Sequence, residues 1–271
     1  MTTGTGSETI GSAMTSTSGK PSSSLTRGQV LGSLLVLGGC AALLTVFNST
    51  DDGLTVAEPP DFGAMDVIDK KREFFAYLSP LVASINDAMR SDRDRVRSIR
   101  EAYDAGEDPG WLDQRWLRRL SGRYEVAFED QELAEALTVL ERRAGVVPVS
   151  LVLAQAAIES GWGTSRFAIE GNNYFGQRCY ETDCGIAPHG RAEASFGLAE
   201  FDSVADSVLS YMMNLNTHAE YSGFRRRRQA LRAEGPVTSG LSLLEELDGY
   251  SERGNEYIEE VRAMIRANDL E

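Results

Sequence analysis

The chain has 271 residues, which is enough for one good-sized domain with appendages. Its 27 Lys and Arg residues against 41 Asp and Glu residues give a formal net charge of −14, which argues against a general affinity for nucleic acid. With only 3 cysteines, the chain is not a small domain framed by disulfides.

The N-terminal part of the chain is typical of a membrane anchor. Residues 1–28 are rich in Ser, Thr and Gly, and we expect a disordered cytoplasmic tail. Residues 29–47 are uncharged and long enough to cross a bilayer as a helix, which takes about 17–25 residues. Lys20 and Arg27 precede this stretch and acidic residues follow it, so the remainder should lie outside the cytoplasm, in the periplasm.

This stretch has two other possible interpretations. A cleaved signal peptide fits poorly with the long polar leader and the long apolar run. The letters LGGC, which end at Cys40, would suit a lipoprotein signal, but residues 41–47 stay apolar where a lipoprotein usually turns polar. We therefore predict a single uncleaved helix in the bacterial inner membrane.

The next segments are predicted to be a linker and a helical lead-in. Residues 48–61 are polar and form the linker, and residues 62–106 carry a broad apolar face at helical spacing, with Pro80 as a kink or restart. A short helix over residues 111–120 follows. Its two tryptophans are either a platform for sugar or core packing, and we expect packing.

A carboxylate at a predicted helix end is the main chemical signal. Residues 151–158 are an apolar helical run, Glu159 follows, and Gly161 is a helix stop. The helix dipole disfavours a carboxylate in a last turn, and burial against Trp162 or Phe167 would also raise its pKa. A raised pKa suits a general acid. The alternative is an ordinary exposed Glu on an amphipathic helix.

Residues 177–200 show no helical period and are predicted to be a hairpin or an irregular loop. They contain Cys179, Cys184 and His189, too few ligands for a typical zinc site, which takes about four. In an oxidising compartment we expect a Cys179–Cys184 disulfide instead.

The C-terminal third is predicted to be helical again, with a buried stripe, a basic run and a last helix over residues 255–267. Asn216, near the end of the helix that carries the stripe, either binds sugar or helps to cap the helix. The four arginines at residues 225–228 are either a solvated face, which we expect, or a contact for carboxylates of a substrate. The stripe consists of Val204, Val208, Tyr211 and Leu215.

Four blocks of sequence, in order, resemble one enzyme family. They are VPVSLVLAQAAIESGWGTSRFA at residues 147–168, GNNYFG at 171–176, YMMNLNTHAEY at 211–221 and GYSERGNEYI at 249–258. The resemblance is to glycoside hydrolase family 73, bacterial β-N-acetylglucosaminidases that cut peptidoglycan, and within it to the Bax-type subgroup. It implies a mainly α (α+β) fold: a lysozyme-like helical domain with a small β-lobe, here preceded by the transmembrane helix.

The resemblance also implies roles for single residues. Glu159 matches the catalytic acid, and Tyr250 matches a tyrosine that lines the cleft near it. Family members often use a second acid from the β-lobe. We place it at Glu193 by position, although no motif selects it over Glu181, Asp183 or Glu200, and the N-acetyl group of the substrate is the alternative. The predicted substrate-binding residues are Trp162, Asn173, Tyr174, Phe175 and Asn216.

Together these expectations describe a membrane-anchored hydrolase. Residues 62–127 would be the helical N-terminal part of the soluble unit and residues 128–271 the catalytic domain. The enzyme would cleave β-1,4 bonds after N-acetylglucosamine in peptidoglycan strands as a monomer, with no metal and no cofactor. The alternatives are a lytic transglycosylase, whose usual Gly-Leu-Met-Gln stretch is missing here, and a peptidoglycan-binding module without turnover.

Overall fold

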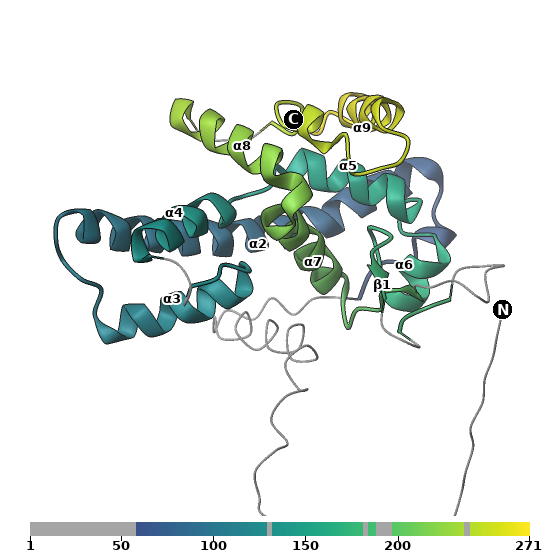
Figure 1. The fold of residues 1–271 in the computed structure, drawn as a ribbon. Helices are drawn as coiled ribbons and strands as arrows, with labels where there is room; N and C mark the ends of the chain where they lie inside the picture. Colours follow the sequence, from purple (N-terminus) through teal and green to yellow (C-terminus); the bar gives the residue numbers. More distant parts are fainter. Residues whose placement is uncertain (1–57, 129–131, 181–183, 188–196, 236–238) are drawn as a thin grey trace, which may run out of the picture. The chain divides into compact units, whose positions relative to one another are not determined.

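The structure is a computed structural model that describes residues 58–128, 132–180, 184–187, 197–235 and 239–271 (Figure 1). These residues belong to one compact unit, Ala42–Glu271, which is mainly helical and carries a two-stranded antiparallel sheet. Within the described ranges no helix is long and apolar enough to cross a membrane. The predicted anchor at residues 29–47 and the tail before it lie outside those ranges and stay predictions.

A single long helix, α2 (Val67–Asp104), makes up most of the predicted lead-in. It starts at Asp66, whose side chain accepts hydrogen bonds from the backbone amides of Ile68 and Asp69, and it follows the short helix η1 (Phe62–Ala64). The helix continues across Pro80 instead of restarting there. Its buried side includes Phe74, Leu78, Val82 and Met89.

Two shorter helices, α3 (Trp111–Arg123) and α4 (Leu133–Arg143), pack on α2 and on each other. Trp116 packs against the core with the guanidinium of Arg95 4.2 Å from its ring centre, as the packing interpretation predicted. Trp111, in contrast, is 70% exposed. The packing prediction is therefore confirmed for Trp116 and wrong for Trp111.

The apolar helix α5 (Val149–Ser160) is buried along most of its length, and it packs on α2 and on α9 (Asn255–Ala267). Its position is set at its start by Asn86 of α2, which exchanges two hydrogen bonds of 2.8 and 2.9 Å with the backbone of Val147. Both groups are buried, so each bond satisfies a group that water does not reach. The segment that leads into α5 is therefore bound directly to the lead-in helix.

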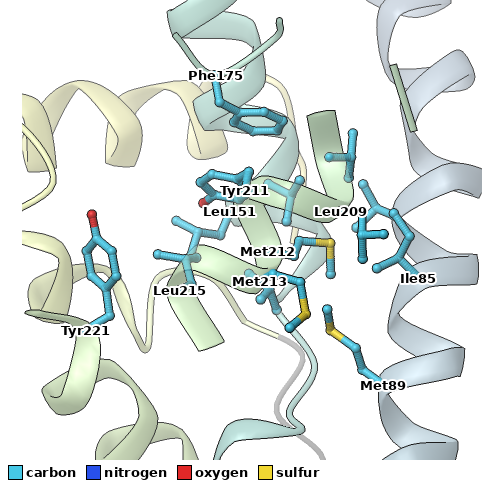
Figure 2. Close-up of a cluster of buried hydrophobic side chains, with 14 of the residues drawn as sticks. Ile85, Met89, Leu151, Phe175, Leu209, Tyr211, Met212, Met213, Leu215 and Tyr221 are labelled. Atoms are coloured by element: carbon cyan, nitrogen blue, oxygen red, sulfur yellow. The ribbon is translucent and has the colours of Figure 1, made fainter. Parts of the chain in front are cut away.

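The predicted stripe on α7 (Val204–Thr217) is buried, and Ser203 caps this helix by accepting from the amide of Asp206. Figure 2 shows this face of α7 meeting side chains from α2 and α5. The labelled side chains of that cluster include Ile85, Met89, Leu151, Leu209, Met212 and Met213. Such a broad contact makes α5, α7 and α2 one core.

The arginine run at residues 225–228 does not form the solvated face that we expected. It lies on α8 (Ser222–Glu234), where Arg226 and Arg227 are exposed but Arg225 and Arg228 keep only 5% and 1% of their surface exposed. The spacing of three explains the difference, because residues three apart share one face of a helix. The interpretation as a contact for substrate carboxylates fails for the two buried members for the same reason.

The two buried arginines bind carbonyl groups at helix ends. Arg225 donates to two carbonyls at the end of α7. Arg228 donates to the carbonyls of Arg142 and Gly145 at 3.0 Å, at the end of α4, and to Oδ1 of Asn216 at 2.7 Å. The last carbonyls of a helix lack partners within it and carry partial negative charge, so cations are favourable there.

The predicted small lobe contains an antiparallel pair, β1 (Arg178–Cys179) with β2 (Gly197–Leu198), in the register Arg178 to Leu198. Cys179 and Cys184 form a disulfide, as expected. The remaining elements are α6 (Arg166–Gly171), η2 (Ala219–Tyr221) and η3 (Leu244–Leu247).

Candidate active site

Glu159 lies in the last turn of α5, as the sequence predicted. Gly161 ends the helix in the left-handed conformation, with φ of 57°, and the amide of Trp162 donates to the carbonyl of Ala157 at 2.9 Å. This is the hydrogen-bond pattern of a Schellman motif, which satisfies carbonyls that the helix leaves unpaired. The turn therefore ends α5 at Ser160, one residue after Glu159.

The side chain of Glu159 is partly buried and accepts a hydrogen bond from α9. The hydroxyl of Tyr257, on α9, donates to its Oε1 at 2.8 Å. Burial raises the pKa of Glu159 above its usual value, and the nearby Glu260 raises it further, whereas the Tyr257 bond and Arg253 act in the opposite direction. Burial is the largest of these influences, so the carboxyl keeps its proton to higher pH than a free Glu does.

Two further hydrogen bonds lead away from Tyr257 into the core. Gln155, one turn before Glu159 on α5 and fully buried, donates from Nε2 to the Tyr257 hydroxyl at 2.9 Å. The hydroxyl of Tyr211, on α7, donates to Oε1 of Gln155. The acid is thus connected to two other helices by polar groups inside an apolar core.

Aromatic rings surround these bonds. Tyr250 stacks on Tyr257 with ring centres 5.3 Å apart, and it meets Tyr211 edge-on at 6.2 Å. Phe175 stacks on Tyr211 at 4.0 Å, which Figure 2 also shows. Tyr250 therefore lies near the acid, since it stacks on the tyrosine that bonds Glu159.

Gly176 lies next to the other oxygen of the acid. A Cβ built on Gly176 would be 3.9 Å from Oε2 of Glu159, and the residue has a φ of 63°, a conformation that favours glycine. Asn173, 1% exposed, holds this turn: its amide nitrogen donates to the carbonyls of Gln177 and Ala199 at 2.9 Å, and its oxygen accepts from the amide of Gln177. Asn173 therefore shapes the turn beside Glu159.

The other predicted substrate-binding residues are placed as follows. Trp162 is partly exposed and contacts Phe74 and Phe75 of α2 edge-on, with ring centres 5.6 and 5.3 Å away. Tyr174 is 1% exposed and stacks on Phe74, and Phe175 is 4% exposed. Tyr174 and Phe175 pack into the core and expose almost no surface to a sugar, whereas substrate binding by the partly exposed Trp162 stays a prediction.

Asn216 requires a correction. It is fully buried, its amide nitrogen donates to the carbonyl of Gly145 at 3.0 Å, and its oxygen accepts from Arg228. With no exposed surface and both polar ends bonded, it has nothing to offer a sugar and instead supports the end of α4. Its position near the end of α7 suggested sugar binding or a cap for that helix, and its hydrogen bonds to Gly145 and Arg228 show neither.

The second acid is not placed. Glu193, Glu181 and Asp183 lie outside the described residues, so their roles stay predictions. Glu200 is described and exposed. Within the described ranges, no group of three or more His, Cys, Asp or Glu side chains is arranged to hold a metal ion.

Comparison with known proteins agrees with this geometry. The glucosaminidase family model, described as mannosyl-glycoprotein endo-beta-N-acetylglucosaminidase, matches residues 134–270. That range is half of the chain and contains Glu159, Tyr250 and Tyr257. The chain belongs to the glucosaminidase family. This glucosaminidase is a glycoside hydrolase, of the type that glycoside hydrolase family 73 represents.

A relative supports the assignment. The glucosaminidase is 33% identical over 199 residues to Protein bax of Escherichia coli (strain K12). The aligned region covers 73% of this chain and 70% of that protein. This alignment is longer than the family match, so the likeness extends beyond residues 134–270. No solved structure gave a significant match.

Sequence reasoning missed the hydrogen bonds that connect the acid of this glucosaminidase to the core. Tyr211 was predicted only as part of the buried stripe, and Tyr257 and Gln155 had no assigned role. One signal was present: Gln155 lies four residues before Glu159 and so shares its helix face, and a polar side chain inside an apolar run needs a partner.

Proposed function

We propose that the protein is a membrane-anchored peptidoglycan hydrolase that cleaves β-1,4 bonds after N-acetylglucosamine, with Glu159 as the general acid. The observation that carries this is the partly buried carboxyl of Glu159, whose pKa is raised and which a tyrosine holds at 2.8 Å. A protonated carboxyl can donate its proton to the glycosidic oxygen as the bond breaks. Membership of the glucosaminidase family supports N-acetylglucosamine as the sugar.

The cleavage also requires stabilisation of the positive charge that develops on the sugar ring. We propose Glu193 of the lobe for this task, with the substrate's own N-acetyl group as the alternative and Tyr250 to position it. The neighbourhood of Gly176 supports an approach from its side, because a glycine leaves room beside Oε2 of Glu159. An acid at a helix end beside a small β-lobe also supports a lysozyme-like arrangement.

We further propose that residues 29–47 anchor the enzyme in the inner membrane, with the catalytic domain in the periplasm and the enzyme acting as a monomer. Lys20 and Arg27 before this stretch support that orientation. The Cys179–Cys184 disulfide agrees with it, because disulfides persist in oxidising compartments. Protease added to spheroplasts should digest the catalytic domain, whereas palmitate labelling that depends on Cys40 would indicate a lipoprotein.

The reaction is tested by digestion of purified peptidoglycan and mass spectrometry of the products. New reducing N-acetylglucosamine ends are expected from the full-length enzyme, and E159Q should reduce their rate by roughly 10²–10⁴-fold. Glu107→Gln is the matched control, because Glu107 is exposed in the turn after α2. Anhydro-muramyl ends would identify a lytic transglycosylase instead, and wild-type turnover by folded E159Q would exclude Glu159 as the acid.

A further inference from the structure

The hydrogen bonds behind Glu159 have a fixed direction. The hydroxyl of Tyr257 has one proton, and because it accepts from Nε2 of Gln155 it can give that proton to Oε1 of Glu159. The amide of Gln155 is turned with its nitrogen toward Tyr257, since its oxygen accepts from the hydroxyl of Tyr211. Each donor therefore orients the next one.

Burial limits the other hydrogen bonds that Tyr211, Gln155 and Tyr257 could make. Gln155 is fully buried and Tyr211 and Tyr257 are 1% and 2% exposed, so water does not supply other partners for them. Burial also raises the pKa of both tyrosines well above the usual value, which keeps both hydroxyl groups protonated and able to donate. A reversed amide would turn Gln155 Oε1 toward Tyr257, and the tyrosine proton would then have a second acceptor.

We propose that Tyr257, Gln155 and Tyr211 are positioning residues of this glucosaminidase, which hold Oε1 of Glu159 as an acceptor and leave Oε2, beside Gly176, to carry the acid proton. The proposal rests on Glu159 being the general acid. With the Tyr257 hydroxyl directed at Oε1, a proton on that oxygen would face another proton. The oxygen beside the glycine is therefore the one from which the proton leaves.

Other charged and titratable groups also face the acid. Arg253, in the turn before α9, lowers the pKa of Glu159, and Glu260, one turn along α9, raises it. The charge of Glu159 also raises the pKa of Tyr250 and of Tyr211. Among the described residues, however, the Tyr257 bond ranks directly after burial in its effect on the acid.

The test removes one hydroxyl at a time from the full-length protein in detergent. In Y257F the pKa of Glu159 should rise, because the donor that stabilises the carboxylate is lost. The alkaline limb of the kcat/KM profile should move to higher pH, and kcat should fall by roughly 10- to 100-fold, as expected for a lost hydrogen bond to a charged group. In Y211F the side-chain amide of Gln155 is free to rotate by about 180°. The shift of the alkaline limb and the fall in kcat should then have the same sign as in Y257F and be smaller.

A double variant separates positioning from packing. If Tyr211 acts only through Gln155 and Tyr257, then Y211F/Y257F should be no slower than Y257F alone. Tyr124→Phe is the control, because it removes a buried hydroxyl that bonds Asp92 rather than any residue near Glu159. Additive losses in the double variant, or an alkaline limb that stays in place in Y257F, would overturn the proposal.

A readout without substrate distinguishes this proposal from the proposed function. Carbon-13 NMR of glutamate carboxyls, with E159Q used to assign the signal, gives the pKa of Glu159 directly. A rise in Y257F and Y211F supports the hydrogen-bonded chain even if the protein fails to cleave peptidoglycan, in which case only the proposed function fails. An unchanged pKa in both variants rejects the chain.

Discussion

Gly145 lies directly against the guanidinium of Arg228. A Cβ built on Gly145 would be 2.3 Å from Cζ of Arg228, and the carbonyl of the same glycine accepts a hydrogen bond of 3.0 Å from that side chain. The absence of a side chain at residue 145 therefore lets a fully buried cation reach the end of α4, just before the helix α5 that carries Glu159 begins.

We expect Gly145→Ala to destabilise the protein by about 1–3 kcal/mol, the usual cost of adding a methyl group to a packed core. The guanidinium would have to leave the carbonyl of Arg142 and the side chain of Asn216 to make room. Urea unfolding of the two proteins measures the difference. Gly122→Ala is the control, since nothing lies within 4 Å of a Cβ there and the change within α3 should be neutral or stabilising.

Arg228→Met should cost at least about 3 kcal/mol in the free energy of unfolding, because several buried carbonyls lose their donor at once. Arg227→Met, one residue away on the exposed face of α8, should change it by less than about 0.5 kcal/mol. Chemical denaturation compares the pair. Equal effects of the two substitutions would mean that Arg228 does not stabilise the helix ends.

Glu159→Gln should make the protein more stable at neutral pH while it removes activity. The pKa of Glu159 is raised in the folded protein, so stability is lost as the pH rises from the unfolded value of about 4.3 through the folded one. The variant lacks this loss and should therefore be more stable than the wild type at pH 7.

Thermal unfolding as a function of pH tests this sign. The advantage of E159Q should disappear as the pH falls below about 4, where the carboxyl is protonated in both states. Glu107→Gln, at an exposed carboxylate, should show no such trend. A larger advantage at low pH than at neutral pH would contradict the burial of Glu159 as the cause.

Replacing Cys179 and Cys184 by Ser should reduce activity as well as stability. The closed loop is short, so the loss of stability should be roughly 2–3 kcal/mol, whereas small displacements near a reacting group can cost about 10²-fold in rate. β1 contains Cys179 and pairs with β2, and the segment after β2 is bonded to Asn173, which shapes the turn beside Glu159. Peptidoglycan digestion and urea unfolding give the two numbers.

Thiol titration tests the premise. Under denaturing and non-reducing conditions these two residues should give no free thiols, and after reduction they should give two. Two thiols before reduction would remove the disulfide from consideration. A double Ser variant with full activity would show that the bridge does not hold the lobe in a way that matters for catalysis.

Local features of the site could be predicted from the sequence. The end of α5 at Gly161 depends on residues a few positions apart, because an apolar period and a glycine are sufficient to define a helix and its stop. The motif around Glu159 also indicated the family. The stripe on α7 was predicted for the same reason: periodicity states which side of a helix is buried.

The surroundings of the acid were decided by the tertiary structure. Tyr257 is 98 residues from Glu159 and Tyr211 is 56 from Gln155, and the period of α9 indicates that Tyr257 is buried without stating where its hydroxyl points. The arginines of α8 show the same limit, because a charged run is normally exposed and only the ends of α4 and α7 explain why two of its members are not. The pattern of a sequence predicts which side of a helix is buried. Each hydrogen bond, in contrast, depends on which polar groups the packed helices bring within about 3 Å of one another.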